Sequence, residues 1–260
     1  MARFFTLASG SSGNSTFIGN ADYGILIDCG LSCKRICEHL LENEMDVSKI
    51  KGIFITHEHI DHIKGLRVLT SKYKIPVYAR TKTLEYLCDN DCVCKDAKLI
   101  SVDDEQVVGD MKIESFKTAH DCVDSCGFVV TTSDMRKVAF ATDLGEVSDE
   151  IKQKIMGSDL VVIESNYDER MLLCGDYTYA LKQRVQKTHL SNDECSSLLP
   201  ELIKTGSTRF VLAHLSENNN MPDIAFKSAE CELSKNGFTS GDDYILSVAP
   251  RFDTSKLMRF

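Results

Sequence analysis

Residues 54–65 read FITHEHIDHIKG and place three of the chain's seven histidines, together with Glu58 and Asp61, within six consecutive positions. Burying that many imidazoles and carboxylates without partners costs roughly several kcal/mol. A metal cation is the partner that satisfies all of them at once. The stretch therefore predicts a metal site, provided that the rest of the chain supplies the remaining ligands.

The histidine-rich stretch follows a predicted strand. KGIFIT, residues 51–56, is an apolar run typical of a buried strand, and the stretch begins at its C-terminal end. Because alternate side chains of an extended segment share a face, His57 and His59 can bind one ion while Asp61 and His62 reach a second. Two ions about 3.5–4 Å apart need a shared ligand. Asp143, from another strand, is the natural candidate.

Further polar residues end apolar runs later in the chain. KTAH ends on His120, FATD on Asp143 and VLAH on His214, and VIES carries Glu164 near its end. Loops at strand ends are where a rigid scaffold presents functional groups. Six of the seven histidines lie at such ends or in adjoining loops, whereas His39 lies within a predicted helix and is expected to be structural.

The order of the predicted elements indicates the fold class. Short β-type runs at residues 4–8, 15–19 and 23–28 open the chain, separated by the turn sequences GSSGNS and GNAD. Ser32 caps a predicted helix through Leu41, and another helix is expected from near Ile63. Later strands are expected at LISV, MKIESFKT, CGFVVTT, KVAFAT, LVVIES, RFVLAH and YILSV, with helices near 147–157, 178–187, 192–204 and 223–235. This order predicts two sheets with helices on their outer faces.

Size and composition bound the organisation. The 260 residues are 43% hydrophobic, with four prolines, no repeats and no linker-like tract, which predicts one domain over residues 1–260. No apolar run approaches the length of a membrane span, and MARFFTLASG lacks the features of a signal peptide. A cytoplasmic location without a membrane partner is expected.

Eleven cysteines are scattered along the chain and are expected to be reduced. The Cys29–Cys33–Cys37 group resembles an iron–sulfur run but lacks the usual tight spacing. The Cys88–Cys92–Cys94 group suggests a zinc knuckle but has no second pair at ribbon spacing. Core or surface thiols are the favoured interpretation for both groups.

Charge argues against a generic nucleic-acid coat protein, because the formal net charge is −9. A nuclease is not excluded, since charge distribution matters more than the sum. LKQRVQK, residues 181–187, carries Lys182, Arg184 and Lys187 shortly before His189. These cations are either an ordinary solvated helix face or a surface that binds a nucleic-acid backbone.

The candidate ligands resemble a known signature. They match, in order and spacing, the HxHxDH, H, D, H pattern of the metallo-β-lactamase-fold hydrolases: His57, His59, Asp61, His62, His120, Asp143 and His214. The resemblance implies an α+β fold, an αββα sandwich of two mixed sheets with helices on the outer faces. It also implies that Asp28, in LIDCG, is the buried aspartate beneath the site.

The resemblance further implies two divalent ions. His57, His59 and His120 would hold the first ion and Asp61, His62 and His214 the second, with Asp143 and a hydroxide bridging them. The two ions, two aspartates and one hydroxide leave about one positive charge, which suits an anionic substrate. Imidazole-rich ligation suits zinc or manganese, with iron as a further option. Relatives with redox di-iron centres carry Glu in place of His59, so hydrolysis is favoured.

Four segments narrow the resemblance: ASGSSGNS at 8–15, ESNYD at 164–168, THLSN at 188–192 and LAHLSENNN at 212–220. Together they resemble the YycJ/WalJ family, which is related to the RNase Z and RNase J nucleases. Thr188 departs from the glycine expected before HLSN.

The same segments contain the residues expected to act on the substrate. Ser191 and Glu194 form an S-x-x-E capping box, which places His189 beside a helix N-terminus where an anion is favoured. By resemblance, Glu164 pairs with His189, which would protonate a leaving oxygen; the alternative is a structural Glu–His hydrogen bond. Asp61 is expected to act in catalysis as well as to bind metal. The expected substrate contacts are Asn14, Ser15, Ser191, Asn192, Lys182, Arg184 and Lys187.

The expected function is metal-dependent hydrolysis of nucleic-acid phosphodiesters. DNA as the polymer and 5′ to 3′ exonuclease polarity rest on the YycJ/WalJ resemblance alone, and RNA stays open. One alternative is a small-molecule hydrolase of cyclic phosphodiesters or thioesters with the same ligands. The other is a non-catalytic regulatory module with structural metals. A secreted lactamase is disfavoured because no signal peptide precedes the domain.

Overall fold

The computed structural model describes residues 1–260, which form two compact units. The first unit comprises Met1–Ser115, Cys122–Arg136 and Pro250–Phe260. The second unit comprises Phe116–Asp121 and Lys137–Ala249. The prediction of one domain over residues 1–260 stays a prediction.

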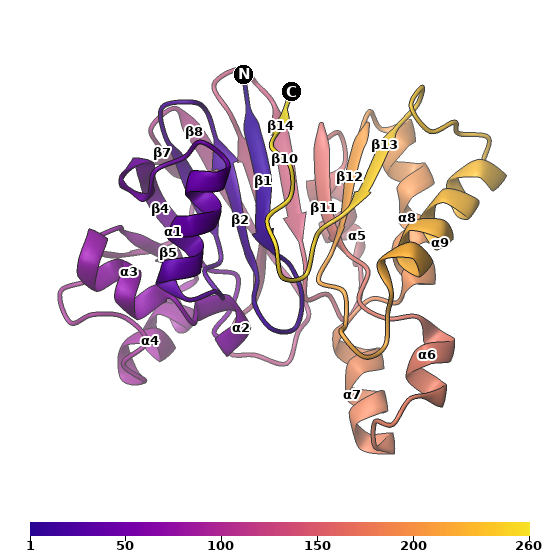
Figure 1. The fold of residues 1–260 in the computed structure, drawn as a ribbon, viewed down its shortest axis with the longest axis horizontal. Helices are drawn as coiled ribbons and strands as arrows, with labels where there is room; N and C mark the ends of the chain where they lie inside the picture. Colours follow the sequence, from indigo (N-terminus) through magenta and orange to yellow (C-terminus); the bar gives the residue numbers. More distant parts are fainter. The chain divides into compact units, whose positions relative to one another are not determined.

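The first unit is built on a mixed sheet, drawn in indigo to magenta in Figure 1 with β14 in yellow. In spatial order, the first four strands are antiparallel neighbours and the last four run parallel to one another. In spatial order the strands are β14 (Met258–Arg259), β1 (Arg3–Ala8), β2 (Ser15–Gly19), β3 (Gly24–Ile27), β4 (Ile50–Phe54), β5 (Val77–Ala79) and β6 (Leu99–Ser101). The short N-terminal strands and the buried strand before the histidine-rich stretch are thus present where the sequence predicts them.

Helices of the first unit bury apolar residues against a common core. The Ser32 side chain accepts a hydrogen bond from the Arg35 amide and so caps α1, as predicted, and Ile36 and Leu40 are fully buried. The helices are α1 (Cys33–Glu42), the 3₁₀ turn η1 (Val47–Lys49), α2 (Ile60–Ile63), α3 (Leu66–Tyr73) and α4 (Thr81–Asp89). In place of the single helix predicted from near Ile63 there are two, a single turn that ends at Ile63 and a longer helix after Gly65.

Three further strands begin in the first unit: β7 (Gln106–Val108), β8 (Met111–Lys117) and β9 (Cys126–Thr131). β7 and β8 form an antiparallel hairpin whose turn uses Gly109 at φ +65°. The sequence predicted no strand at β7, whose three residues, QVV, include only two apolar side chains.

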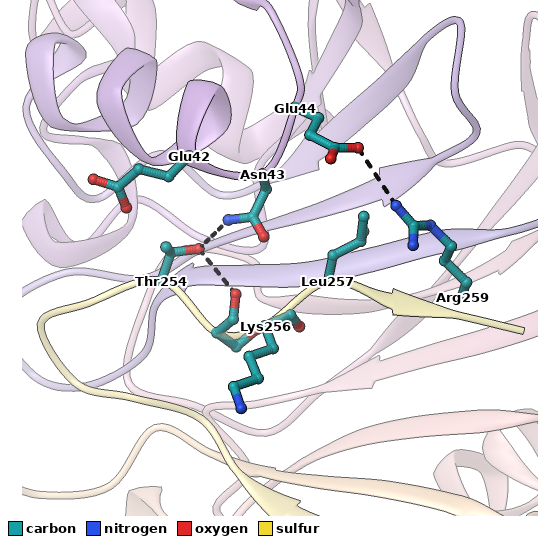
Figure 2. Close-up of a pocket in the computed structure, with 8 residues that line it drawn as sticks. Glu42, Asn43, Glu44, Thr254, Lys256, Leu257 and Arg259 are labelled. Carbon is teal, nitrogen blue, oxygen red and sulfur yellow. Dashed lines mark hydrogen bonds and ion pairs between the residues drawn. The ribbon is translucent and has the colours of Figure 1, made fainter.

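The C-terminal segment closes the first unit over the end of α1. Asn43 Nδ2 donates to Thr254 Oγ1 over 2.7 Å, and Arg259 Nη2 lies 3.4 Å from Glu44 Oε2. Figure 2 shows these groups around a pocket that Lys256 also lines. The segment ends in β14, which pairs with β1.

The second unit contains four parallel strands. Their spatial order is β10 (Lys137–Ala141), β11 (Leu160–Glu164), β12 (Arg209–Ala213) and β13 (Ile245–Val248). Because the carboxyl ends of parallel strands lie at the same edge, this register brings Asp143, Glu164 and His214 to one edge of the sheet. The strand-end polar residues of the sequence therefore meet in space within this unit.

Five helices connect these strands: α5 (Asp149–Ile155), α6 (Glu169–Cys174), α7 (Tyr179–Thr188), α8 (Asn192–Lys204) and α9 (Pro222–Lys235). Four of them lie where the sequence predicts helices. The sequence reading missed α6, whose only fully buried residue is Leu172 and whose apolar pattern is too short to show. The predicted capping box of Ser191 and Glu194 is present at the start of α8.

Three expectations from the sequence concern membrane spans, cysteines and His39. No helix of the chain combines the length and the apolar character that crossing a membrane requires. None of the eleven cysteines forms a disulfide, and Cys29, Cys126 and Cys195 are buried. His39 is buried on α1 with its Nδ1 2.7 Å from the Leu7 carbonyl oxygen, a structural contact of the kind expected.

Candidate metal centre

The histidine-rich stretch of the first unit folds into a cluster of imidazoles. His57 lies three residues beyond Phe54, the last residue of β4. His59 is the N-cap of α2, and His62 lies within α2. The ring centroids of His57 and His59 are 4.6 Å apart, and those of His57 and His62 are 4.1 Å apart. The turn from strand to helix thus gathers the three rings, with Asp61 Oδ2 3.4 Å from His62 Nε2.

Asp28 anchors this cluster from beneath. Its Oδ1 accepts from the Thr56 amide over 2.8 Å, and its Oδ2 accepts from Thr56 Oγ1 over 2.9 Å. Oδ2 also lies 2.8 Å from His62 Nδ1. A carboxylate at Nδ1 keeps the imidazole proton there, so Nε2 carries the lone pair that a metal would use. The sequence reading singled out Asp28 by resemblance but missed Thr56.

The predicted GSSGNS turn holds Asp61 in place. Asn14 Nδ2 lies 3.2 Å from Asp61 Oδ2 and 3.1 Å from His62 Nε2, which fits an Nε2 that accepts. The Asn14 amide donates to the Asp61 carbonyl over 2.7 Å. The Ser15 hydroxyl donates to the Asp28 carbonyl over 2.9 Å. Gly30 is required beside this loop, because a Cβ there would overlap the Asp61 carbonyl oxygen.

Glu58, between the first two histidines, has a separate contact that the sequence did not predict. It is buried, and its Oε1 accepts from the Val123 amide over 2.7 Å. Glu58 therefore holds the loop around Val123 against the histidine-rich stretch of the first unit.

The second unit brings together a second group of donors. Ligand atoms of Asp143, Glu164, His189 and His214 all lie within 4.8 Å of one another. Glu164 ends β11, and His189 is the C-cap residue that follows Thr188, the last residue of α7. The Asp143 Oδ1 atom is 3.3 Å from His214 Nδ1 and 3.7 Å from His120 Nε2.

Glu164 orients two imidazoles at once. Its Oε1 lies 2.7 Å from His189 Nδ1 and 2.9 Å from His214 Nδ1, while its Oε2 accepts from the Leu144 and Leu190 amides. Burial raises the pKa of this carboxyl, but attraction and hydrogen bonds from His189 and His214 outweigh burial and hold the pKa well below its usual range. The ionised carboxylate therefore fixes Nδ1 of both rings as donors and leaves each Nε2 facing away from it.

His120 is held as a neutral imidazole. Burial lowers its pKa, with a smaller opposing effect from Asp143 and a further lowering by His189. Its Nδ1 lies 2.9 Å from the Thr188 carbonyl oxygen, which accepts a hydrogen bond from Nδ1–H. A neutral imidazole with one nitrogen committed to a backbone carbonyl is the usual form of a metal-ligating histidine.

Three residues of these groups have left-handed backbone conformations. Asp28, Asp143 and His214 have φ of +59°, +57° and +55°, and each lies just beyond the end of a strand. Such conformations in non-glycine residues cost about 1–3 kcal/mol and gather at functional sites. The backbone of both units is thus shaped to aim these side chains.

A buried network of asparagines ties the motif segments of the second unit together. Asn192 Oδ1 accepts from Ser165 Oγ over 2.6 Å and from Asn220 Nδ2 over 2.8 Å. Asn166 Nδ2 donates to the His214 carbonyl over 2.8 Å. The sequence reading placed Asn192 among the substrate contacts, and that role stays a prediction. It missed Asn166 and Asn220, which carry no local signal.

The N-terminus of α8 offers fewer free donors than the capping box suggested. The backbone amide of Leu190 already donates to Glu164, and that of Ser191 donates to Glu194. The backbone amide of Asn192 donates to the Tyr167 carbonyl, and that of Glu194 donates to Ser191 Oγ. The inference that backbone N–H groups bind a phosphate there is therefore weakened, because capping has used most of them.

The three predicted cations of α7 differ in their surroundings. Lys182 Nζ donates to the Leu173 carbonyl over 2.7 Å, and Arg184 Nε lies 2.5 Å from Asp121 Oδ2. Lys187 is exposed in the last turn of α7. Thr188, in place of the expected glycine, is accommodated because its hydroxyl donates to the Arg184 carbonyl over 2.9 Å.

The donor chemistry of both units fits divalent metal ions. Each unit supplies imidazoles and carboxylates, and the Nδ1 atoms of four histidines contact Asp28, Glu164 or the Thr188 carbonyl: His62, His120, His189 and His214. Such outer hydrogen bonds are typical of metal-ligating histidines. The residues present are therefore suited to metal binding.

Comparisons with known proteins agree with this chemistry. Residues 23–215 match the family model described as a Beta-lactamase superfamily domain. Two structures cover 98% of the chain with low identity and so show the fold: the metallo-β-lactamase fold protein YhfI of Bacillus subtilis (TM-score 0.71, 17% identity, 98% of that chain) and Zn²⁺-bound PqqB of Methylobacterium extorquens (TM-score 0.72, 16% identity, 100% of that chain). The predicted class, α+β with two mixed sheets and helices in the metallo-β-lactamase fold, is confirmed. The protein is a metal-dependent hydrolase of this superfamily.

Sequence relatives define the family within that superfamily. Exodeoxyribonuclease YycJ of Bacillus anthracis is 38% identical over 258 residues, 96% of this chain and 97% of the relative. Exodeoxyribonuclease WalJ of Streptococcus pneumoniae is 32% identical over 93% of this chain and 92% of the relative. Ribonuclease J of Mycoplasma genitalium is 34% identical over 125 residues, 42% of this chain and 21% of the relative. The chain belongs to the YycJ/WalJ family.

Proposed function

We propose that this protein hydrolyses phosphodiester bonds of nucleic acid, as a DNA exonuclease that proceeds from 5′ to 3′. The observation that carries the proposal is the Glu164–His189 pair, with 2.7 Å between Oε1 and Nδ1. A small-molecule hydrolase would not need a carboxylate-supported imidazole beside its metal ligands. Two relatives that cover almost the whole chain are named exodeoxyribonucleases, which supports DNA as the polymer.

Two divalent ions are the proposed cofactors, zinc or manganese, with iron as a further option. The proposed ligands are His57, His59 and His120 for one ion and Asp61, His62 and His214 for the other, with Asp143 shared. When bound, such ions supply an ionised water as nucleophile and neutralise charge on the phosphoryl group. Asp61 is proposed to act in the reaction as well as to bind metal.

His189 is the proposed general acid. The Nδ1–H group donates a hydrogen bond to Glu164 and keeps its proton. A second proton on Nε2 therefore makes an imidazolium next to a buried carboxylate. The negative charge of Glu164 stabilises that imidazolium, and Nε2 can then release its proton to the leaving oxygen. Glu164 itself stays ionised throughout, as its lowered pKa requires.

The proposed substrate contacts complete the assignment. Asn14 contacts Asp61 and Ser15 contacts the Asp28 carbonyl, whereas Ser191 and Asn192 follow His189 in sequence. Lys182, Arg184 and Lys187 lie on the helix that leads to His189. Nucleic acid is the proposed partner, with DNA preferred over RNA, and the proposed location is cytoplasmic.

Metal-loaded protein should be incubated with end-labelled single-stranded DNA, duplex DNA and RNA. Mononucleotides released from the 5′ end of DNA are the expected products, because product length and label position report the substrate and polarity together. Asp143→Ala is the matched inactive control. If neither polymer is shortened while a small phosphodiester is hydrolysed, the protein is a small-molecule hydrolase instead.

A further inference from the structure

The side chain of Tyr179 is exposed on the second unit without any part in its packing. It is the first residue of α7, which Thr178 caps, and 76% of its surface is exposed. The local apolar cluster consists of Tyr167, Leu172 and Val185, with Tyr177 and Leu181 packed against it. Tyr179 belongs to none of these contacts, so α7 does not need its ring for stability.

One hydrogen bond gives the ring a defined direction. Gln183 Nε2 donates to Tyr179 Oη over 2.7 Å. Because Gln183 lies one turn further along α7, this bond lays the phenol along the helix, toward the C-terminal end. The ring is thus held by its hydroxyl while most of its surface stays in contact with water.

The same face of α7 continues to the proposed general acid. Tyr179, Gln183 and Lys187 are spaced four residues apart, and all three are exposed. Ten residues of helix span about 15 Å, so the stripe runs roughly that distance to His189, the C-cap residue of α7. One strand of B-form DNA rises about 3.4 Å per nucleotide, so the 15 Å length of the helix corresponds to about four nucleotides.

Charge on α7 is complementary to nucleic acid. The helix carries Lys182, Arg184 and Lys187 and no carboxylate, although the whole chain has a formal net charge of −9. Isolated exposed aromatic residues are common and need no explanation. An aromatic ring held on the helix face that leads to His189, on a helix whose own charges are all positive, matches the combination that single-strand binding proteins use.

We propose that Tyr179 stacks on an unpaired base of the nucleic-acid strand, while Lys187 contacts the strand's phosphates. This inference rests on the proposed nuclease function and specifies how the polymer is positioned. Tyr179 is thereby a substrate-binding residue that takes no part in the chemistry. Stacking is tolerant of sequence, because every base has a π face.

Binding is measured on metal-loaded protein, by fluorescence anisotropy of labelled single-stranded oligonucleotides whose phosphorothioate linkages resist hydrolysis. Tyr179→Ala should weaken binding about five- to 150-fold, whereas Tyr179→Phe, which keeps the ring, should bind within about twofold of wild type. Tyr86→Ala on α4, where Tyr86 is 36% exposed, is the matched control. DNA and RNA oligonucleotides are compared separately, since either offers unpaired bases.

Salt dependence separates stacking from charge. Removing one phosphate contact on a single strand changes the slope of log K against log salt by about 0.7. Lys187→Ala should lower the slope by that amount, whereas Tyr179→Ala should shift the line without changing its slope. An unchanged affinity for Tyr179→Ala, or a loss equal to that of Tyr86→Ala, overturns the inference.

A spectroscopic test uses the absence of tryptophan from the sequence. Tyr179→Trp creates a single indole fluorophore whose emission should be quenched when oligonucleotide is added, and Tyr86→Trp should show no such change. If wild type cleaves DNA but the emission of the Tyr179→Trp variant does not respond, the stacking inference fails and the nuclease proposal stands. If wild type neither binds nor cleaves any nucleic acid, both fail.

Discussion

Asp28 Oδ2 lies 2.8 Å from His62 Nδ1, across 34 residues of chain. The same oxygen accepts from Thr56 Oγ1, and Oδ1 accepts from the Thr56 amide. One buried carboxylate therefore sets both the path of the backbone before the histidine motif and the proton position on one of its rings.

Asp28→Asn should weaken metal binding about 10- to 100-fold. An amide nitrogen in place of Oδ2 would face the His62 Nδ1 proton, and the ring would move its proton to Nε2, where a metal must bind. Metal content after dialysis against buffered zinc or manganese measures the change. Asp22→Asn, at an exposed turn, is the matched control and should bind normally. Full metal occupancy in folded Asp28→Asn would show that Asp28 does not govern the tautomer.

His189→Ala should lower the rate of DNA hydrolysis about 10²- to 10⁴-fold, the usual contribution of a general acid. Hydrolysis of bis-p-nitrophenyl phosphate should fall much less, because p-nitrophenolate leaves without being protonated. Rates on the two substrates at saturating metal provide the measurement. Equal losses on both would mean that His189 holds structure rather than donating a proton.

Glu164→Gln tests the support of that acid. The NH₂ group of the glutamine must face either the two histidine Nδ1–H donors or the backbone amides of Leu144 and Leu190. In either orientation, donors face donors and stay buried without acceptors. The pKa of Glu164 is lower in the folded protein than in the unfolded chain. The ionised carboxylate therefore stabilises the fold fully above the unfolded pKa of about 4.3. This stabilisation is lost as the pH falls through the folded pKa. Urea midpoints of metal-free wild type and Glu164→Gln should therefore differ at pH 7 and converge on acidification. A gap that persists unchanged to pH 3 would contradict this.

The candidate metal donors could be selected from sequence because each lies at a place that local pattern marks, and their role as ligands stays a prediction. HEHIDH follows an apolar run, and His120, Asp143 and His214 follow others, so strand ends mark their positions. The chemistry of imidazole and carboxylate then indicates metal. The predicted helices of the second unit also form, because each has a cap or an apolar period long enough to be seen.

The supporting hydrogen bonds could not be predicted in the same way. Thr56, Asn166 and Asn220 are ordinary polar residues, and their partners lie up to about 50 residues away. Which amide meets which carbonyl is decided by strand register, not by local sequence. The left-handed conformations of Asp143 and His214 are equally invisible, because no glycine marks them.

Asn192→Ala distinguishes a structural role from substrate binding. Its amide is buried between Ser165 and Asn220, so its loss removes the acceptor of the Ser165 hydroxyl and two hydrogen bonds to Asn220, at a cost of about 1–3 kcal/mol. The free energy of unfolding from urea titration should fall by that amount. Asn218→Ala, at an exposed position in the adjacent loop, should change it by less than about 0.5 kcal/mol. An undiminished stability with a raised KM for DNA would instead support direct substrate contact.

Cys33 tests the alternative that the first cysteine group binds an iron–sulfur cluster. Burial and the neighbouring Cys37 raise the pKa of the Cys33 thiol to about 11, although Lys72 opposes the shift. Because only the thiolate alkylates or ligates readily, Cys33 should react with iodoacetamide at pH 8 about 10- to 100-fold more slowly than exposed Cys231, and its rate should climb until the pH nears its pKa. Cys37→Ala removes the neighbouring thiol and should speed alkylation of Cys33. Mass spectrometry of the labelled peptides follows each site. Rapid labelling of Cys33 at pH 8 would show a thiolate poised for ligation and would reopen the cluster alternative.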